Sequence, residues 1–417
     1  LGLTGRGIGV AVLDSGIATF HDDLTPGATS TTLYPYGIQR VAQFVDFVNG
    51  QALPYDDNGH GSHVAGTIAG NGYDSRGQKS GIAPDASLVS LKVLDATGQG
   101  RISTIIAALD WVALNAATHN IRVVNLSIGA RIHESYWTDP LTLATKVLTD
   151  RGIVVVVAAG NMGKNAAGAA QYGGITAPGN APWVLTVGAS STEGTLTRLD
   201  DVIGSYSSRG PTFLDWGAKP DLVAPGTGTV SLAVPGSTFY STKAAYLRNG
   251  AFPTAAKPYL ALSGTSMAAP VVSGTVALML QANPTLTPNL VKAILQFTAE
   301  NRPAYNALTE GGGFLNALGA VRLARFYKGA KAGDRVPVQK VWSRHIIWGT
   351  HELLHGIMVP SKNAWALSTV WGTAKTLGDE GDNIIWGTEG DGDNIIWGTD
   401  DGDNIIWGTD DGDNIIW

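Results

Sequence analysis

Short apolar runs alternate with segments of helical spacing through the first three quarters of the chain. The runs are rich in Val, Ile and Leu and have the length of strands buried on both faces. They predict strands at 8–13, 87–93, 123–127, 153–159 and 184–189. Helical spacing occurs at 63–69, 102–117, 140–149, 267–282 and 287–298. This alternation predicts an α/β fold of three layers, in which helices cover both faces of a mostly parallel central sheet.

The pattern changes near Phe326. The residues that follow are rich in Lys, Gly and Ala, which is typical of a linker. A unit Asp-Asn-Ile-Ile-Trp-Gly-Thr then begins at Asp382, Asp393 and Asp403, and it is cut short after Asp413. We therefore expect a large domain over 1–327, a linker over 328–340, and an acidic Trp-Gly-Thr repeat tail over 341–417, partly disordered or folded as a small β-layer.

The composition of the 417-residue chain narrows the class of protein. Hydrophobic residues make up 44% and charged residues 15%, which fits a globular body and excludes an extended polyelectrolyte. The net charge of -6 argues against a nucleic-acid binder, because no basic stripe is available for phosphates. The longest apolar run, 153–159, is far short of the roughly 20 residues that span a bilayer. Cysteine is absent, which excludes disulfides and thiolate chemistry.

The start of the chain has two interpretations. Leu1 is not an initiator Met, and residues 5–13 lead directly into a predicted core strand. Either a signal peptide and a propeptide have been removed, or the boundary is arbitrary. The first interpretation implies an exported protein.

Polar side chains follow two of the predicted strands. Asp14 comes directly after the first strand, and Asn161 follows the apolar run 153–159. Open parallel sheets bind ligands at such carboxyl ends. Taken singly, either residue could serve only its own turn. The functional interpretation makes Asn161 a hydrogen-bond donor to a developing oxyanion.

His60 stands among small residues in the segment Asn58-Gly59-His60-Gly61-Ser62-His63. These neighbours let the imidazole come close to a substrate. A metal is the alternative, but the two histidines lack the spacing of adjacent helical turns and a carboxylate at the usual offset. We interpret His60 as a general base and His63 as a packed, hydrogen-bonded neighbour.

Ser266 opens a predicted apolar helix. Serine at a helix start usually acts only as a cap. Here Gly264 permits close approach and small residues follow. The hydroxyl of Ser266 can therefore lie at the positive end of the helix, where developing negative charge is stabilised.

Four sequence blocks together resemble the subtilisin family of serine proteases, the subtilases. The resemblance extends over roughly residues 4–327, and the order Asp, His, Asn, Ser matches as well. The blocks are Val12-Leu13-Asp14-Ser15-Gly16, His60-Gly61-Ser62-His63-Val64-Ala65-Gly66-Thr67, Ala159-Gly160-Asn161 and Gly264-Thr265-Ser266-Met267-Ala268-Ala269-Pro270.

The resemblance implies a secreted serine endopeptidase of broad specificity. Ser266 would attack the peptide carbonyl, and His60 would take its proton and return it to the leaving amine. Asp14 would orient the imidazole, and Asn161 would bind the oxyanion together with the Ser266 N–H. The family also implies polypeptide substrates, a propeptide in the precursor, and chemistry that requires no cofactor. We expect a monomer.

The resemblance also implies a substrate-binding region. One wall is the strand edge that pairs with an extended peptide, and the other walls form the pocket for the side chain before the cut. The predicted residues are Asn125, Leu126, Ser127, Ile128, Gly129, Ala158, Ala159, Gly160 and Thr176. None of them is charged, so we expect a preference for apolar or aromatic side chains at that position.

Two features depart from the family pattern or extend it. Residues 227–262, which include Tyr240, Tyr246 and Tyr259, form an extra loop before the nucleophile block. Family members often bind structural calcium, and Asn71 and Asp74 are weak candidates here, because calcium requires six or more oxygens.

Three competing interpretations remain. The segment His351-Glu352-Leu353-Leu354-His355 matches a zinc-protease motif literally, but it lacks a supporting helix and a third ligand. The tail could bind calcium or a partner through its Asp-Gly-Asp turns. The chain could also be an inactive scaffold that only binds. The complete set of competent catalytic residues disfavours this last interpretation.

Overall fold

The fold is described from a computed structural model. It describes residues 2–24, 40–331 and 334–348, and beyond these only the backbone of short strands in the tail. The central sheet contains eight strands in the order β2-β3-β1-β4-β5-β6-β7, and β8 pairs with β6. All pairs are parallel except β6 with β7. The strands are β1 Gly9–Asp14, β2 Val41–Asp46, β3 Ser87–Lys92, β4 Ile121–Leu126, β5 Val154–Ala158, β6 Leu185–Ser191, β7 Val202–Ile203 and β8 Leu222–Pro225.

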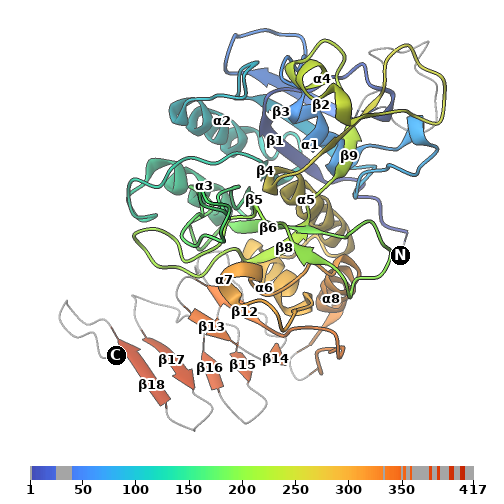
Figure 1. Cartoon of the computed structure of the whole chain (residues 1–417). Coiled ribbons are helices and arrows are strands. Elements are labelled where there is room, and N and C mark those ends of the chain that lie inside the picture. The colour runs from blue at the N-terminus through green and yellow to red at the C-terminus, as the bar shows by residue number, and fades with distance from the viewer. Residues whose placement is uncertain are drawn as a thin grey trace.

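Helices cover both faces of this sheet, as Figure 1 shows, so the expected three-layer α/β fold is confirmed. On one side α1 packs against α5, and on the other α2 packs against α3. The helices are α1 His60–Ala69, α2 Ile102–Asn115, α3 Pro140–Asp150, α5 Thr265–Ala282, α6 Pro288–Thr298, α7 Ala307–Glu310 and α8 Ala317–Gly329. Thr287 caps α6, because its hydroxyl accepts the N–H of Leu290.

α5 is the central helix of the core. It is long and apolar enough to cross a membrane by length and composition, yet 83% of its apolar window is buried inside the protein. It contacts β4, β5, β6 and β8 as well as α1. The start of α5, which includes Ser266, therefore lies at the edge of the sheet where β4 and β5 end.

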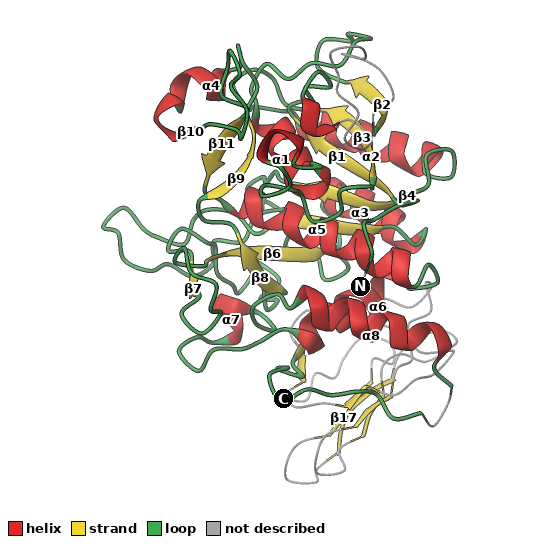
Figure 2. Ribbon diagram, turned by 90° about the vertical axis from the view of Figure 1, so that its right-hand side faces the viewer, coloured by secondary structure: helices red, strands yellow, loops and turns green. Residues whose placement is uncertain are grey.

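The extra loop 227–262 is a folded unit rather than an irregular loop. It contains β9 Thr229–Leu232, α4 Thr238–Thr242, the 3-10 turn η3 Ala244–Tyr246, β10 Leu247–Arg248 and β11 Tyr259–Leu262. The three strands form an antiparallel sheet in the order β10-β11-β9, which lies beside α1 (Figure 2). The unit reaches the start of α1, where His60 stands.

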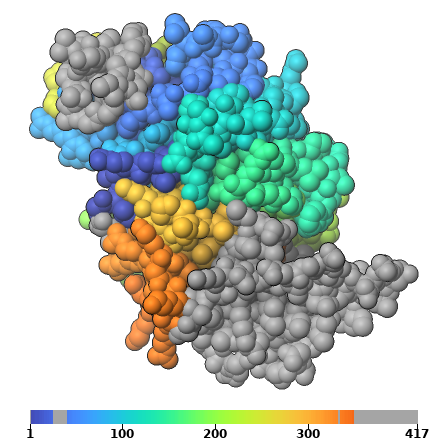
Figure 3. All heavy atoms as spheres, turned by 180° about the vertical axis from the view of Figure 1, so that it is seen from behind, coloured from blue at the N-terminus to red at the C-terminus, as the bar shows by residue number. Residues whose placement is uncertain are grey.

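Residues 336–348 pack onto the body of the protein. Trp342, Ile346, Ile347 and Trp348 are buried. The Ser343 N–H donates to Ala299 O at 2.7 Å at the end of α6. Figure 3 shows the surface of the residues after 300, in orange, directly below the yellow segment that precedes them in the chain. Residues 336–348, which lie in the predicted linker and tail, therefore pack against the predicted domain 1–327.

The zinc-motif interpretation of residues 351–355 is disfavoured by the backbone. His351–Leu353 form strand β13, which pairs with β12 Ile346–Trp348. A zinc-protease motif requires a helix that brings both histidines to one face. Leu354 and His355 lie outside the described residues. The further tail strands form an antiparallel sheet, β14 Ile357–Met358, β15 Lys375–Leu377, β16 Asn383–Ile385, β17 Asn394–Gly398 and β18 Asn404–Gly408.

Candidate active site

Asp14 and His60 form a hydrogen-bonded pair. Asp14 is the last residue of β1, and His60 is the first residue of α1. The imidazole Nδ1 lies 2.7 Å from Asp14 Oδ1, and the aspartate is buried. Gly59 precedes His60 with φ of 95°, a left-handed conformation that glycine adopts without strain. The tight turn brings the ring back over the carboxylate.

The protonation of His60 is governed by two opposing effects. Burial lowers the pKa of the imidazole, whereas the charge and hydrogen bond of Asp14 raise it. Together with the charge of Asp56, the effects of Asp14 outweigh burial, so the pKa of His60 lies above its ordinary value of 6.5. Burial also lowers the pKa of His63, to about 3, and that ring stays neutral. His63 Nε2 contacts the carbonyls of Thr229 and Leu260, which confirms it as a packed, hydrogen-bonded neighbour.

Asp56 organises the loop that carries His60. Its Oδ1 accepts from the Ser15 hydroxyl and from the Gly59 N–H, and its Oδ2 accepts from both the N–H and the hydroxyl of Ser62. A fully bonded buried carboxylate of this kind fixes the loops that it joins. No local sequence pattern identifies Asp56, because its partners come from two separate segments.

Ser266 lies in the first turn of α5. Its hydroxyl donates to Ser127 O at 3.0 Å, and the Ser127 hydroxyl donates in turn to Ser266 O at 2.8 Å. The carbonyl of Ser266 is available because Pro270, four residues later, has no N–H to donate to it. The start of α5 is therefore fastened to the end of β4 at Ser127.

Asn161 lies three residues beyond the end of β5 and is exposed. Its Oδ1 accepts the N–H of Thr265 at 2.9 Å and the Thr265 hydroxyl at 3.1 Å. Both bonds use the amide oxygen, so the Nδ2 donor is free to face solvent or substrate. Thr265 is therefore a positioning residue for Asn161. Thr265 lies in the block Gly264-Thr265-Ser266, but its local sequence does not indicate this role.

These side chains meet at one cleft. His60, Asn161 and Ser266 all line a cavity of about 680 Å³. A second cavity of about 360 Å³ is lined by His60 together with Ser127, Ile128 and Gly129. His60, Asn161 and Ser266, together with Ser127, Ile128 and Gly129, thus line two cavities that meet at His60, while Asp14 is buried and bonded to His60.

The other six predicted substrate residues line neither of these two cavities. Asn125, Leu126, Ala158 and Ala159 are buried. Asn125 serves the interior, because its amide donates to the Ser127 hydroxyl and its oxygen accepts from Ser273 on α5. Thr176 lies against both Gly129 and Gly160; a Cβ on Gly129 would stand 2.3 Å from Thr176 Oγ1.

A model of the subtilase family matches residues 5–320. The chain belongs to the subtilase family. This subtilase is 38% identical over 324 residues to "Serine protease AprX" of Bacillus subtilis (strain 168), covering 76% of this chain and 67% of the relative. It is 34% identical over 321 residues to "Subtilisin Savinase" of Lederbergia lenta, covering 77% and 93%.

A solved structure agrees with these relatives. The subtilase is similar to the "Crystal structure of a cold adapted subtilisin-like serine proteinase", with a TM-score of 0.53, 29% identity, and coverage of 76% of this chain and 89% of that chain. Family and relatives together make this subtilase a serine-type endopeptidase that acts on polypeptides.

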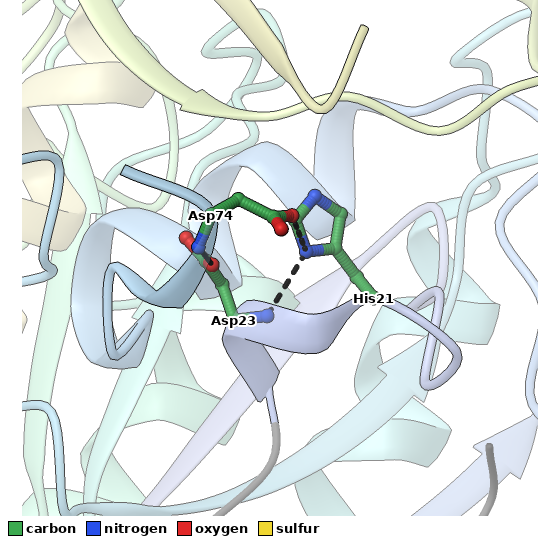
Figure 4. Close-up of side chains that lie close together, drawn as sticks. All are labelled: His21, Asp23 and Asp74. Carbon is green, nitrogen blue, oxygen red and sulfur yellow. Dashed lines mark hydrogen bonds and ion pairs between the residues drawn. The ribbon is translucent and has the colours of Figure 1, made fainter. Parts of the chain in front are cut away.

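The weak calcium candidates of the subtilase, Asn71 and Asp74, have protein partners in the structure, and calcium binding by them stays a prediction. Asn71 Oδ1 accepts the N–H of Tyr73 at 2.8 Å and so serves its own turn. The carboxylate of Asp74 instead converges with His21 and Asp23, whose ligating atoms all lie within 4.8 Å of one another (Figure 4). One imidazole and two carboxylates fall short of the six to eight oxygens that calcium binds.

The three residues in Figure 4 are engaged with one another and with the extra loop. His21 Nε2 lies 2.9 Å from Pro258 O, and Asp23 Oδ2 accepts the Tyr259 hydroxyl at 2.8 Å. Asp23 Oδ1 accepts the N–H of Asp74. The cluster is therefore a hydrogen-bond junction between three loops.

Proposed function

We propose that this subtilase cleaves peptide bonds through an acyl-enzyme on Ser266. The observation that carries the proposal is the cleft itself, where His60, bonded to Asp14, lies along one surface with Ser266 and Asn161. Neutral His60 accepts the hydroxyl proton through Nε2, because Nδ1 is occupied by Asp14. The imidazolium formed in this step is stabilised by the adjacent carboxylate, and it then protonates the leaving amine.

In the proposed mechanism, substrate binding turns the Ser266 hydroxyl toward His60. The Ser266 hydroxyl is bonded to Ser127 O in the free enzyme. An N–H of an extended peptide that pairs with residues 127–129 takes over that carbonyl, and rotation of the Ser266 side chain then turns its oxygen toward His60. The oxyanion accepts from the N–H of Ser266, at the start of α5, and from Asn161 Nδ2.

The pocket before the cut is proposed to favour apolar or aromatic side chains. Its walls at residues 126–129 and 158–160 and its far side at 174–178 contain no charged residue. Profiling with a peptide library tests this preference, and a strict requirement for a charged side chain before the cut would contradict it. Family membership also supports an extracellular place of action and a propeptide in the precursor, which we include in the proposal.

Labelling with a fluorophosphonate tests the proposed nucleophile. We expect one label per chain on the peptide that contains Ser266, and loss of the label in Ser266→Ala. Ser263→Ala serves as the matched control, because Ser263 is exposed in the same segment and should label as the unchanged protein does. Labelling that persists in Ser266→Ala would refute the assignment, and no labelling of the folded protein would favour the inactive scaffold.

A further inference from the structure

The extra unit 227–262 forms the far half of the active-site cleft. The cavity of about 680 Å³ is lined by His60, Asn161 and Ser266 and also by Lys243 and Arg248 of the extra unit. None of the predicted substrate residues lines this cavity. The predicted substrate residues Ser127, Ile128 and Gly129 line the smaller cavity instead. The two cavities share only His60 and Phe239.

This division assigns the larger cavity to one half of the substrate. In the proposed function the part before the cut pairs with residues 127–129. A peptide that continues past Ser266 therefore leaves through the larger cavity. The residues after the cut are then recognised by the extra unit, which departs from the short family pattern.

The larger cavity is lined by two positively charged side chains, Lys243 and Arg248. Lys243 is half-buried and Arg248 is exposed, and no Asp or Glu lines the cavity with them. Within the part of the chain that the structure describes, neither cation has a carboxylate within 4.0 Å. The Lys243 ammonium instead lies 5.0 Å from the centre of the Phe239 ring, and Arg248 donates only to the nearby backbone carbonyls of Ala245 and Leu247.

The extra unit is fastened directly to the catalytic loop. The N–H groups of Thr238 and Phe239 donate to the carbonyls of Asp57 and Asn58, both at 2.9 Å. The Phe239 ring meets the His60 ring edge-on, with 6.0 Å between centres. Lys243 closes α4 at its C-terminal end, one turn after Phe239. The position of this ammonium is thus set relative to the reacting groups.

We propose that this cavity selects substrates with Asp or Glu in the first few positions after the cut. Lys243 and Arg248 recognise the carboxylates by charge. The inference rests on the proposed function and adds a second specificity to it, acidic after the cut beside apolar before it. Charged pairs near a protein surface have modest strength, so we expect a preference of about two- to fivefold for each cation.

Internally quenched peptides provide the test. All peptides share one apolar half before the cut and carry Glu, Gln or Lys at the second or third position after it. We expect kcat/KM to fall in the order Glu, Gln, Lys, and the advantage of Glu over Gln to vanish at 1 M salt, where charges are screened within about 3 Å. A p-nitroanilide of the same apolar half, which has no residue after the cut, gives the reference rate for each variant.

Variants assign the preference to the two cations. In the double variant Lys243→Gln with Arg248→Gln, the ratio of Glu to Gln substrates should fall to about one. Lys257→Gln is the matched control, because Lys257 belongs to the same unit and is exposed but does not line the cavity; it should keep the ratio of the unchanged enzyme.

The outcomes separate this inference from the function on which it rests. Equal rates for Glu and Gln peptides in an enzyme that cleaves both and labels on Ser266 would overturn the inference alone. A preference that survives the double variant would overturn the assignment to Lys243 and Arg248. Failure to cleave any peptide, together with failure to label, would overturn both.

Discussion

At the scale of single residues, the His60–Asp14 pair sets the pH dependence of catalysis. His60 must be neutral to accept the proton of Ser266, and its pKa lies above 6.5 because Asp14 and Asp56 together outweigh burial, with Asp14 the larger of the two contributions. We therefore expect kcat/KM to rise with pH and to reach half of its plateau above pH 6.5. In Asp14→Asn the negative charge is lost, so the midpoint should move to lower pH as the plateau falls.

A pH series of kcat/KM checks this prediction. Asp150→Asn is a suitable control, because Asp150 lies at the end of α3, lines neither cavity and should leave the midpoint unchanged. A midpoint in Asp14→Asn at or above that of the unchanged enzyme would show that another group governs His60.

Asn161 offers a second residue-scale prediction. Its oxygen is held by Thr265, which leaves the amide N–H to meet the oxyanion. Asn161→Leu should lower kcat by about 10²–10³ with little change in KM, a magnitude established in subtilisin itself and carried over through the family. Steady-state kinetics on one peptide measures both constants. If KM rises while kcat stays unchanged, Asn161 contributes to substrate binding in the ground state instead.

At the scale of elements, a buried charge cluster joins β8 to α6. Asp221 directly precedes β8, and its carboxylate lies 2.8 Å from the ammonium of Lys219 and 2.9 Å from that of Lys292. All three side chains are buried. Asp221→Ala leaves two buried cations without their carboxylate, which should lower the free energy of unfolding by about 3–5 kcal/mol. Denaturant unfolding in a Ser266→Ala background, where self-cleavage is prevented, measures the loss.

Asp150→Ala provides the comparison for this cluster. Asp150 pairs with Lys146 on the surface of α3 with half of its side chain exposed, so its removal should cost only about 0.3–0.5 kcal/mol. Similar losses in the two variants would show that the buried cluster contributes no more than a surface pair.

Elements differ in how far the sequence predicts them. β1 and β3 to β6 lie within one or two residues of the prediction, because each is a buried apolar run. β2 was missed because its residues are only partly buried, which weakens the pattern. The strands of the extra unit were missed for another reason: they are short, and contacts with α1 and the His60 loop hold them in place.

The sequence likewise predicts only part of the candidate active site, because some residues act through partners that are distant in the chain. Polar residues at strand ends identified Asp14 and Asn161, and small neighbours identified His60 and Ser266. The roles of Thr265 and Asp56 depend on partners more than 40 positions away or in two segments at once, which no local pattern records. The calcium candidates Asn71 and Asp74 stay a prediction, because a loop sequence does not reveal which oxygens converge.

At the scale of the whole molecule, the structure predicts where the chain can be shortened. The segment 336–348 buries Trp342, Ile346, Ile347 and Trp348 against the body. Burial of each large apolar side chain is worth about 1.5–3 kcal/mol. Truncation after Gly333 should therefore lower the free energy of unfolding by about 5 kcal/mol or more, whereas truncation after Leu353 keeps this segment and should cost little.

Thermal unfolding of both shortened proteins in the Ser266→Ala background measures the difference. The same two truncations of the active enzyme should cleave a short peptide at similar rates at low temperature, as long as both remain folded. Equal melting temperatures would place the end of the globular body before residue 334 after all.

Formation of an acyl-enzyme on Ser266 is the central step of the proposed function. Rapid mixing with a p-nitrophenyl ester, followed by acid quenching and mass spectrometry, tests it directly. We predict a burst of about one p-nitrophenol per active site and one acyl group on the peptide that contains Ser266, both absent in Ser266→Ala. Steady turnover with no burst and no acylated Ser266, or turnover by Ser266→Ala at the unchanged rate, would contradict it.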